Sequence, residues 1–237
     1  MFPLYYTGIG KRPLNEDFYF FFQLDDVCVV GVADGVGGNE GGEIASRKAV
    51  ETFIKSFKQY YNSETISETI LKCFYETHDL IIKLTKDDEK VSNMATTLTV
   101  ACISDSTVNI GHVGDSRAYL VRKNGIKQLT DDDTEVNELL TKGLITKTEA
   151  INYPRKNILT NAIGIKKDFK VKVTNFELKN SDRLLLSTDG FYSAITKEEI
   201  RDFSKKNSEF SNFFFDIVNV AINDKPSDNF TVIAIEI

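Results

Sequence analysis

The sequence is short of histidine and cysteine, which restricts the kind of metal site that it can build. Among its 237 residues are two histidines, His78 and His112, and three cysteines. Any metal must therefore be held mainly by oxygen, and oxygen ligands favour Mg²⁺ or Mn²⁺ over Zn²⁺. The cysteines, Cys28, Cys73 and Cys102, stand far apart within apolar segments. This placement predicts reduced, buried thiols and excludes disulfides and a zinc site.

Other absences narrow the class of protein. No apolar run approaches about 18 residues, and residues 1–6 lack the basic and apolar regions of a signal peptide. The net charge is −6 without any dense stripe of Lys and Arg, which argues against a nucleic-acid partner. No Pro-, Gly- or Ser-rich linker divides the chain. We therefore expect a monomeric, cytoplasmic protein with one domain over residues 1–237 and no membrane partner.

The segment 27–42 organises the chain. It begins as an apolar strand, reaches one carboxylate at Asp34, and breaks into glycines before a helix with Glu43 in its first turn. A lone charge at the end of a buried strand is costly unless a cation lies there. No Gly-Lys-Ser/Thr follows, so the glycines are not a P-loop. The segment indicates either a metal site at Asp34 or a strand-to-helix turn without chemical importance.

A hairpin is expected around this segment. The aromatic run 18–22 predicts a strand, residues 23–26 a turn, and residues 27–34 the second strand. In an antiparallel pair the start of one strand lies beside the end of the next. Glu16 or Asp17 should therefore lie near Asp34.

Apolar spacing predicts the remaining elements. Helices are expected on apolar stripes from Ala45 and from Ile66, the second capped within 63–66, with His78 on the surface and 87–90 in a solvated loop. A polar insertion at 131–165, with helices at 134–142 and 146–152, is typical of a flap. Hairpins without strict β-α-β alternation favour an α+β sandwich of antiparallel sheets. The other expected elements are strands at 4–9, 95–103, 108–113, 118–121, 169–178, 183–187 and 230–237, a hairpin turn at 114–116 and a last helix over 210–221.

Three more aspartates stand at strand ends. Asp189 ends a strand as Asp34 does, Asp228 precedes one, and Asp115 lies in the expected hairpin turn. Each alone is more often a turn former than a ligand. If they converge, two carboxylates about 4 Å apart repel by about 4 kcal/mol at an effective dielectric constant of about 20, and divalent cations would relieve this repulsion.

Six motifs occur in an order that resembles the metal-dependent type 2C serine/threonine protein phosphatases. The resemblance covers nearly the whole chain, and the flap, with 143–146, 149–150 and 153–155, is similar to that of small stand-alone bacterial members. The motifs are Arg12-x-x-Asn15-Glu16-Asp17, Ala33-Asp34-Gly35-x-Gly37-Gly38, Met94-Ala95-Thr96-Thr97, Val113-Gly114-Asp115-Ser116-Arg117, Ser187-Thr188-Asp189-Gly190 and Asp228-Asn229-Phe230-Thr231.

The resemblance implies a four-layer α-β-β-α sandwich with a binuclear Mn²⁺ or Mg²⁺ centre at one end of two central antiparallel sheets. Asp34 would bridge the two metals, and the Gly35 carbonyl would bind one of them. Asp189 and Asp228 would complete the first metal's site. Asp115 would join Asp189 in a weaker third site.

Further roles follow from the same resemblance. Glu16 and Asp17 would act on the second metal, partly through water. Arg12 would bind the substrate phosphate, although an isolated arginine is more often a solvated surface residue. Arg12 and Asp34 are thus the expected catalytic residues.

The implied activity is hydrolysis of phosphoserine and phosphothreonine on proteins by a metal-activated water, reversing the action of a serine/threonine kinase. Such chemistry depends on positioning and electrostatics and needs no Ser, Cys or His nucleophile. The expected partners are phosphorylated proteins, including such a kinase or its substrates. Two alternatives stay open: a catalytically silent module that binds phosphoproteins, and a phosphatase dedicated to one partner such as an anti-sigma antagonist.

Three residues depart from the family pattern. Val36 stands two residues after Asp34, where many members have a histidine that is a candidate general acid. Ser193 stands four residues after Asp189, where many have aspartate, which weakens the case for a third metal. Asp133 stands where the flap often starts with Asp-His-Ser/Thr.

Because Val36 replaces that histidine, we predict a pH–rate profile for phosphate release without an imidazole-like limb. The leaving group would be protonated by water or by another group. The measurement is kcat/KM as a function of pH. A clear limb near pH ~6.5 that survives replacement of His78 and His112 would identify a different acid.

Overall fold

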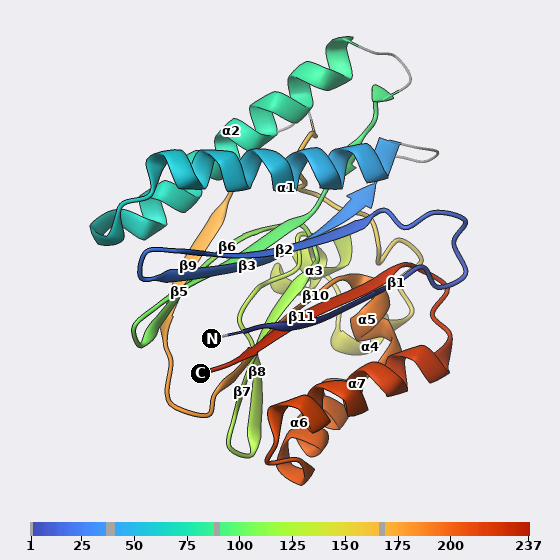
Figure 1. Ribbon diagram of the computed structural model, residues 1–237. Coiled ribbons are helices and arrows are strands. Elements are labelled where there is room, and N and C mark those ends of the chain that lie inside the picture. The colour runs from blue at the N-terminus through green and yellow to red at the C-terminus, as the bar shows by residue number, and fades with distance from the viewer. Residues whose placement is uncertain (1, 37–40, 88–90, 166–168) are drawn as a thin grey trace.

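The computed structural model describes residues 2–36, 41–87, 91–165 and 169–237. Two antiparallel β-sheets stack face to face, with helices covering both outer faces (Figure 1). The predicted four-layer α-β-β-α sandwich is therefore confirmed. Gly37 and Gly38 of the glycine-rich motif and residues 88–90 of the expected loop lie outside the described residues.

One sheet has six strands and lies under two long helices. Its order is β2-β3-β5-β6-β9, with the short β4 paired to β3. The helices α1 and α2 run across its outer face (Figure 1). The bounds are β2 Asp17–Leu24, β3 Val27–Val36, β4 Ala95–Thr96, β5 Leu98–Ser104, β6 Thr107–Val113, β9 Lys172–Glu177, α1 Gly41–Tyr60 and α2 Ile66–Asp87.

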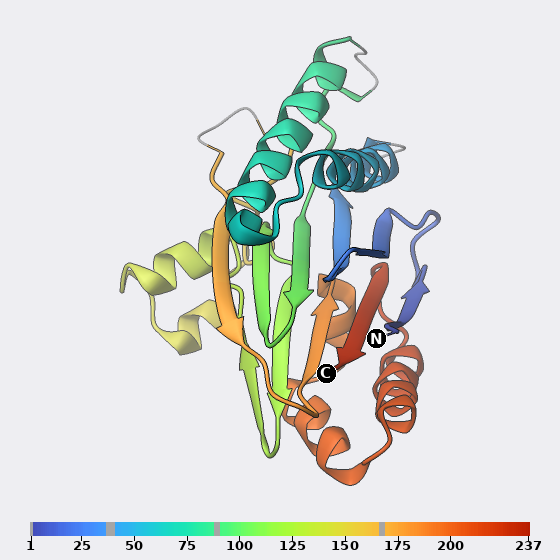
Figure 2. The same ribbon diagram turned by 60° about the vertical axis from the view of Figure 1, so that its left-hand side comes forward.

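The other sheet has five strands in the order β1-β11-β10-β7-β8. Helices α5, α6 and α7 belong to its side of the sandwich, while α3 and α4 form the flap, which projects from the side (Figure 2). The bounds are β1 Leu4–Gly8, β7 Arg117–Arg122, β8 Gly125–Gln128, β10 Arg183–Ser187, β11 Phe230–Glu236, α3 Glu135–Thr141, α4 Lys147–Ile151, α5 Asp189–Ala194, α6 Lys197–Lys206 and α7 Phe210–Asp224.

Three apolar cores join the four layers. Phe53 and Phe74 pack between the long helices and the six-stranded sheet, and both are fully buried as the apolar stripes predict. Val30 and Ile233 meet between the sheets. Phe213 packs between α7 and the five-stranded sheet. Because β3 is covered on both faces, its apolar run is nearly continuous and does not alternate.

The predicted hairpin is confirmed. β2 and β3 pair antiparallel, and Asp17 lies directly opposite Asp34. The predicted end of the second strand at Asp34 is wrong, because β3 continues to Val36 by pairing with β4. Asp34 is therefore fixed inside a ladder instead of standing at a loose strand end.

The predicted hairpin turn at 114–116 is wrong. β6 pairs with β5 and β9 in one sheet, whereas β7 pairs with β8 and β10 in the other. The segment 114–116 therefore carries the chain from one sheet to the other, and Gly114 adopts φ +102° there. Asp115 is placed between the sheets by this crossing.

Smaller predictions also need correction. The N-cap before the second helix is Asn62, whose side chain accepts the Glu64 N–H, and a 3₁₀ turn over Ser63–Thr65 precedes α2. The strand expected over 95–103 is divided into β4 and β5, and the strand expected from 169 begins only at Lys172. β8, α5 and α6 were not predicted.

His78 is not a plain surface residue. Its ring stacks on Phe169 with 3.9 Å between centroids, and its Nδ1 accepts the N–H of Gly164 at 3.3 Å. Burial lowers the pKa of this imidazole. His78 thus attaches α2 to the C-terminal end of the flap.

None of the described helices is both long and apolar enough to cross a membrane. The three cysteines are free and buried, as the sequence predicts.

Removing a ring from the helix–sheet core should cost much of the stability. Phe53 is fully buried and its ring centroid lies 5.6 Å from that of Phe74 and 5.8 Å from that of Phe20. Phe53→Ala should lower the free energy of unfolding by about 3–5 kcal/mol, measured by urea denaturation. Phe215→Ala, at a 57% exposed position of α7, is the control and should change it by less than about 0.5 kcal/mol. Equal losses in the two variants would contradict this account of the core.

Candidate metal centre and flap

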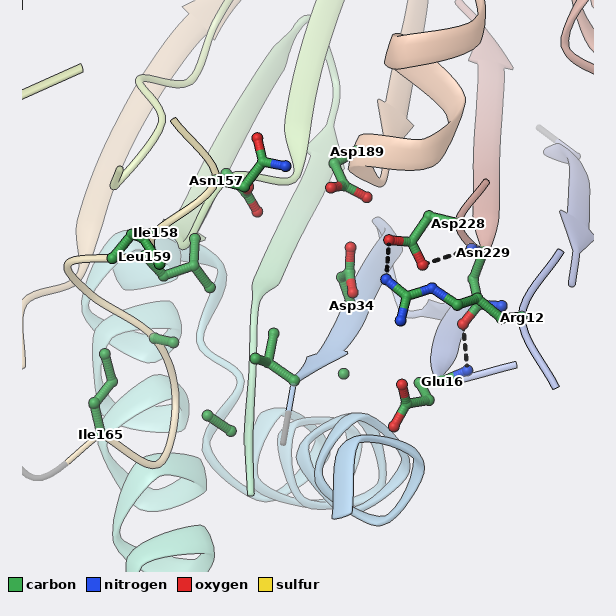
Figure 3. Close-up of a pocket in the computed structure, with 15 residues that line it drawn as sticks. Arg12, Glu16, Asp34, Asn157, Ile158, Leu159, Ile165, Asp189, Asp228 and Asn229 are labelled. Carbon is green, nitrogen blue, oxygen red and sulfur yellow. Dashed lines mark hydrogen bonds and ion pairs between the residues drawn. The ribbon is translucent and has the colours of Figure 1, made fainter. Parts of the chain in front are cut away.

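Six acidic side chains gather at one end of the two sheets. Five of them line a cavity of about 530 Å³ (Figure 3). Asp17 is buried and does not line this cavity. The elements converge there because β2 starts, β11 starts and β10 ends at this edge. The acids are Glu16 before β2, Asp17 at its start, Asp34 on β3, Asp115 between β6 and β7, Asp189 at the start of α5 and Asp228 before β11.

The buried Asp17 and the half-buried Asp34 form the centre of the group. Burial raises the pKa of Asp17 to about 7, and the charges of Asp189 and Asp228 contribute. Burial and then Asp17 raise the pKa of Asp34 well above its ordinary value. Asp17 Oδ2 accepts a hydrogen bond from the Thr188 hydroxyl at 2.8 Å, but Oδ1 has no partner. Ionising these carboxylates therefore lowers the stability of the fold.

The main chain of Asp34 is fixed by two threonines. The Thr97 hydroxyl accepts the Asp34 N–H at 2.9 Å, and the Asp34 carbonyl accepts from the Thr97 N–H and the Thr96 hydroxyl, both at 2.9 Å. Gly35 follows, where a Cβ would stand 2.2 Å from the Gly42 carbonyl oxygen. Only glycine fits between β3 and the start of α1.

Glu16 and Asn229 connect the N-terminal loop to β11. Asn229 accepts the Glu16 N–H at 2.8 Å and donates to the carbonyls of Ile9 and Leu14. Burial raises the pKa of Glu16, and the N–H groups at the start of α1 oppose this only in part. Glu16 Oε1 has no hydrogen-bond partner.

Arg12 is paired with an acid of the same site. Its Nη2 lies 2.6 Å from Asp228 Oδ2 (Figure 3), and about half of its side chain is exposed at the cavity. Asp228 also accepts the Asn229 N–H at 2.9 Å. Arg12 is therefore close enough to the acids to reach a ligand bound among them.

Asp115 is held on both sides by the base of the flap. The Gly114 N–H donates to Asp133 Oδ2 at 3.0 Å, and Arg117 donates through Nε and Nη2 to Asp132 at 2.6–3.1 Å. Asp133 also accepts from Asn161 and from Lys172, the latter at 2.5 Å.

These bonds join both ends of the flap to the crossing between the sheets. Burial raises the pKa of Asp115 to about 7, and the charge of Asp189 adds to the shift.

Two departures from the family pattern have visible surroundings. Val36 is 43% exposed at the cavity and offers no proton. The Ser193 hydroxyl donates to the Asp189 carbonyl at 2.6 Å, so it is bonded back to the preceding turn of its own helix.

The flap forms the remaining wall of the cavity. Asn157, Ile158, Leu159 and Ile165 line it opposite the acids (Figure 3). Among the described residues that line this cavity there is no histidine.

The donor set fits a hard divalent cation. All candidate donors are oxygens, which Mg²⁺ and Mn²⁺ prefer. Among the described residues, four buried side-chain polar atoms lack a partner, and two of them are Glu16 Oε1 and Asp17 Oδ1. No three His, Cys, Asp or Glu side chains of the described ranges stand close enough to hold an ion as they are. Asp228 is paired with Arg12. The case that these residues can bind a divalent cation therefore rests on the oxygen donors and on the two oxygens without a hydrogen-bond partner.

Sequence reasoning named all the acids but missed their supports. Thr96, Thr97, Thr188 and Asn229 stand inside the quoted motifs, yet no role was predicted for them. The feature of the sequence that could have identified them is a small polar residue next to a predicted metal ligand. Asp132 had no signal, because an acid in a polar loop is most simply solvated.

Comparison with known proteins agrees with this geometry. Residues 8–230 match the family model described as protein phosphatase 2C. The serine/threonine phosphatase stp of Listeria welshimeri is 34% identical over 97% of this chain and 93% of its own length. The protein phosphatase PhpP of Streptococcus pneumoniae is 33% identical over 95% of this chain and 93% of its own. The crystal structure of serine/threonine phosphatase Stp1 from Staphylococcus aureus superposes with a TM-score of 0.92 at 26% identity, over 99% of this chain and 94% of that one.

The fold and the gathered acids define a metal-dependent protein phosphatase. The chain belongs to the protein phosphatase 2C family, the metal-dependent serine/threonine phosphatases that its ordered motifs resemble. The predicted family, fold and enzyme class are confirmed. The residue roles stay predictions.

Removing one buried charge should stabilise the metal-free protein. Because the pKa of Asp17 is about 7 in the fold and 3.8 in the unfolded chain, this group stabilises the fold only at low pH. Stability is lost as the pH rises from 3.8 through about 7. Asp17→Asn can still accept the Thr188 bond without the charge.

In EDTA at pH ~8 we expect Asp17→Asn to unfold with about 2–4 kcal/mol more free energy than the wild type, since one pKa unit is about 1.4 kcal/mol. At pH ~4 the two should converge. Urea denaturation measures both, and exposed Asp25→Asn is the control that should change neither. If Asp17→Asn is less stable than the wild type at pH ~8, the charge of Asp17 does not destabilise the metal-free fold and this prediction is wrong.

Proposed function

We propose that this chain hydrolyses phosphoserine and phosphothreonine on proteins with two Mn²⁺ or Mg²⁺ ions, and a weaker third, at the gathered acids. Its metal-dependent family supports the chemistry, and the names of the Listeria and Staphylococcus relatives support the substrate class. The single observation that carries the proposal is the pairing of the buried Asp17 with the half-buried Asp34 across the hairpin, beside further acids. A module that only binds phosphoproteins would gain nothing from this repulsion.

In the proposed site the acids divide between the ions. Asp34 would hold both ions and the Gly35 carbonyl would hold one of them, and Asp189 and Asp228 would complete the first ion's set. Glu16 and Asp17, each with a partnerless oxygen, serve the other. When bound, two such ions lower the pKa of a water and stabilise charge on the attacking and leaving oxygens. Asp115 with Asp189 would form the weaker third site, and Ser193 adds no carboxylate there.

The chain's own residues orient the substrate. Arg12 turns its planar guanidinium from Asp228 to the phosphate, whose oxygens it can bind in a bidentate pair. The threonines at Asp34 keep the acids in register, and the flap wall at Ile158 excludes water from one side of the phosphate. With Val36 at the position of the missing histidine, the leaving oxygen would take its proton from water or from another group.

The proposed setting is cytoplasmic. The described chain would act as one monomeric catalytic domain with a flap at about 131–165. Its substrates would include the targets of a serine/threonine kinase, or the kinase itself.

Loss of one acid tests the proposal. We expect phosphate release from a phosphothreonine peptide to require Mn²⁺ or Mg²⁺ and to stop in EDTA. It should fall at least ~100-fold in Asp189→Asn, because this substitution removes a carboxylate that would hold the ion that stabilises the transition state. Asp202→Asn, exposed on α6, is the matched control and should retain full activity. Circular dichroism verifies folding.

A folded wild type that binds the phosphopeptide but releases no phosphate with any divalent metal would overturn the enzyme and favour the binding module.

A further inference from the structure

A second cavity lies beside the catalytic one, and this inference about it rests on the proposed function. It has a volume of about 560 Å³ and lies between the flap and α5. Asp115 and Asn157 line both cavities, so the two are adjacent. A chain with its phosphoresidue in the first cavity therefore reaches the second within a few residues, since an extended chain advances about 3.3 Å per residue.

The flap wall of the second cavity carries an apolar patch. Val136 and Leu140 of α3 and Ala150 and Ile151 of α4 form it, beside the polar Thr134, Asn137, Lys156 and Asn157. Neither helix has a buried residue, in contrast to the buried stripes of α1 and α2. Ile151 is 70% exposed. The described chain thus leaves this apolar face uncovered where it meets the active site.

The opposite wall is rigid and its main charge is neutralised. Arg117 binds Asp132 through two nitrogens, and its guanidinium carbon lies 3.7 Å from the centre of the Tyr192 ring. Gln128 and the Asp132 carboxylate are also bonded, at 3.0 Å. Because the cation and the acid satisfy each other, this wall does not call for a charged ligand. An aromatic face opposite aliphatic side chains suits an apolar one.

We propose that the second cavity is a substrate subsite that binds an apolar side chain within three residues of the phosphoresidue. Ile151 and Ala150 are its specificity-determining residues. The flap then selects substrates by the sequence around the phosphoresidue, whereas the acids and Arg12 act on the phosphate alone. The occupant is part of the substrate protein, because the subsite adjoins the cavity where the phosphate is bound.

The test compares phosphothreonine peptides that carry Leu or Ser at each of the three positions before and after the phosphoresidue. The readout is the ratio of kcat/KM for the Leu peptide to that for the Ser peptide. We expect the wild type to prefer Leu at one position by about tenfold or more. In Ile151→Gln the ratio should fall several-fold. In Ala150→Phe, whose ring fills the cavity, it should fall to about one.

Leu144→Gln is the matched control. Leu144 is 66% exposed on the same flap and lines neither cavity, so its ratio should equal that of the wild type. No Leu preference in the wild type, a preference that survives in Ala150→Phe, or an equal fall in Leu144→Gln would each overturn the subsite. Wild-type failure to hydrolyse any peptide and p-nitrophenyl phosphate would instead overturn the proposed function, and the subsite with it.

Discussion

The repulsion between the gathered carboxylates is the constraint on which the rest of this structure depends. The buried Asp17 faces the half-buried Asp34 across a hairpin, and Asp189 and Asp228 add like charge. No folding advantage explains such a group, because hydrophobic residues of similar size would pack there without this cost. The fold compensates with a large sandwich core and holds the acids at the ends of its sheets, where five of them line the cavity.

Holding these acids requires supports that are themselves fixed. The threonines at Asp34, the Thr188 hydroxyl at Asp17 and the Asn229 amide at the N-terminal loop are buried and hydrogen-bonded. Each comes from a different part of the sequence, so the site exists only when both sheets are assembled. Arg12 sits at the exposed rim instead, where its pairing with Asp228 leaves it free to exchange partners.

The residue pattern within a short segment could predict those features that depend on that segment alone. The pairing of Asp17 with Asp34 follows from a hairpin, and the helical stripes follow from four-residue spacing. The placement of Asp115 could not be predicted, because Gly-Asp-Ser reads the same in a hairpin and in a crossing between sheets. Only the pairing of β6 with β9 and of β7 with β10 decides between them. The contacts of His78 and Asp132 are likewise between residues far apart in the sequence, and no residue spacing predicts them.

The uneven burial of the chain has a consequence for its motions. Helices α3 and α4 bury no side chain, whereas the Asp34 amide lies in a ladder under two covering layers. Segments with few buried contacts open at a small fraction of the global unfolding free energy. Amide hydrogens of the flap should therefore exchange through local openings while those around the acids exchange only when the whole sandwich unfolds. The molecule combines a rigid catalytic frame with a wall that can re-form around each substrate.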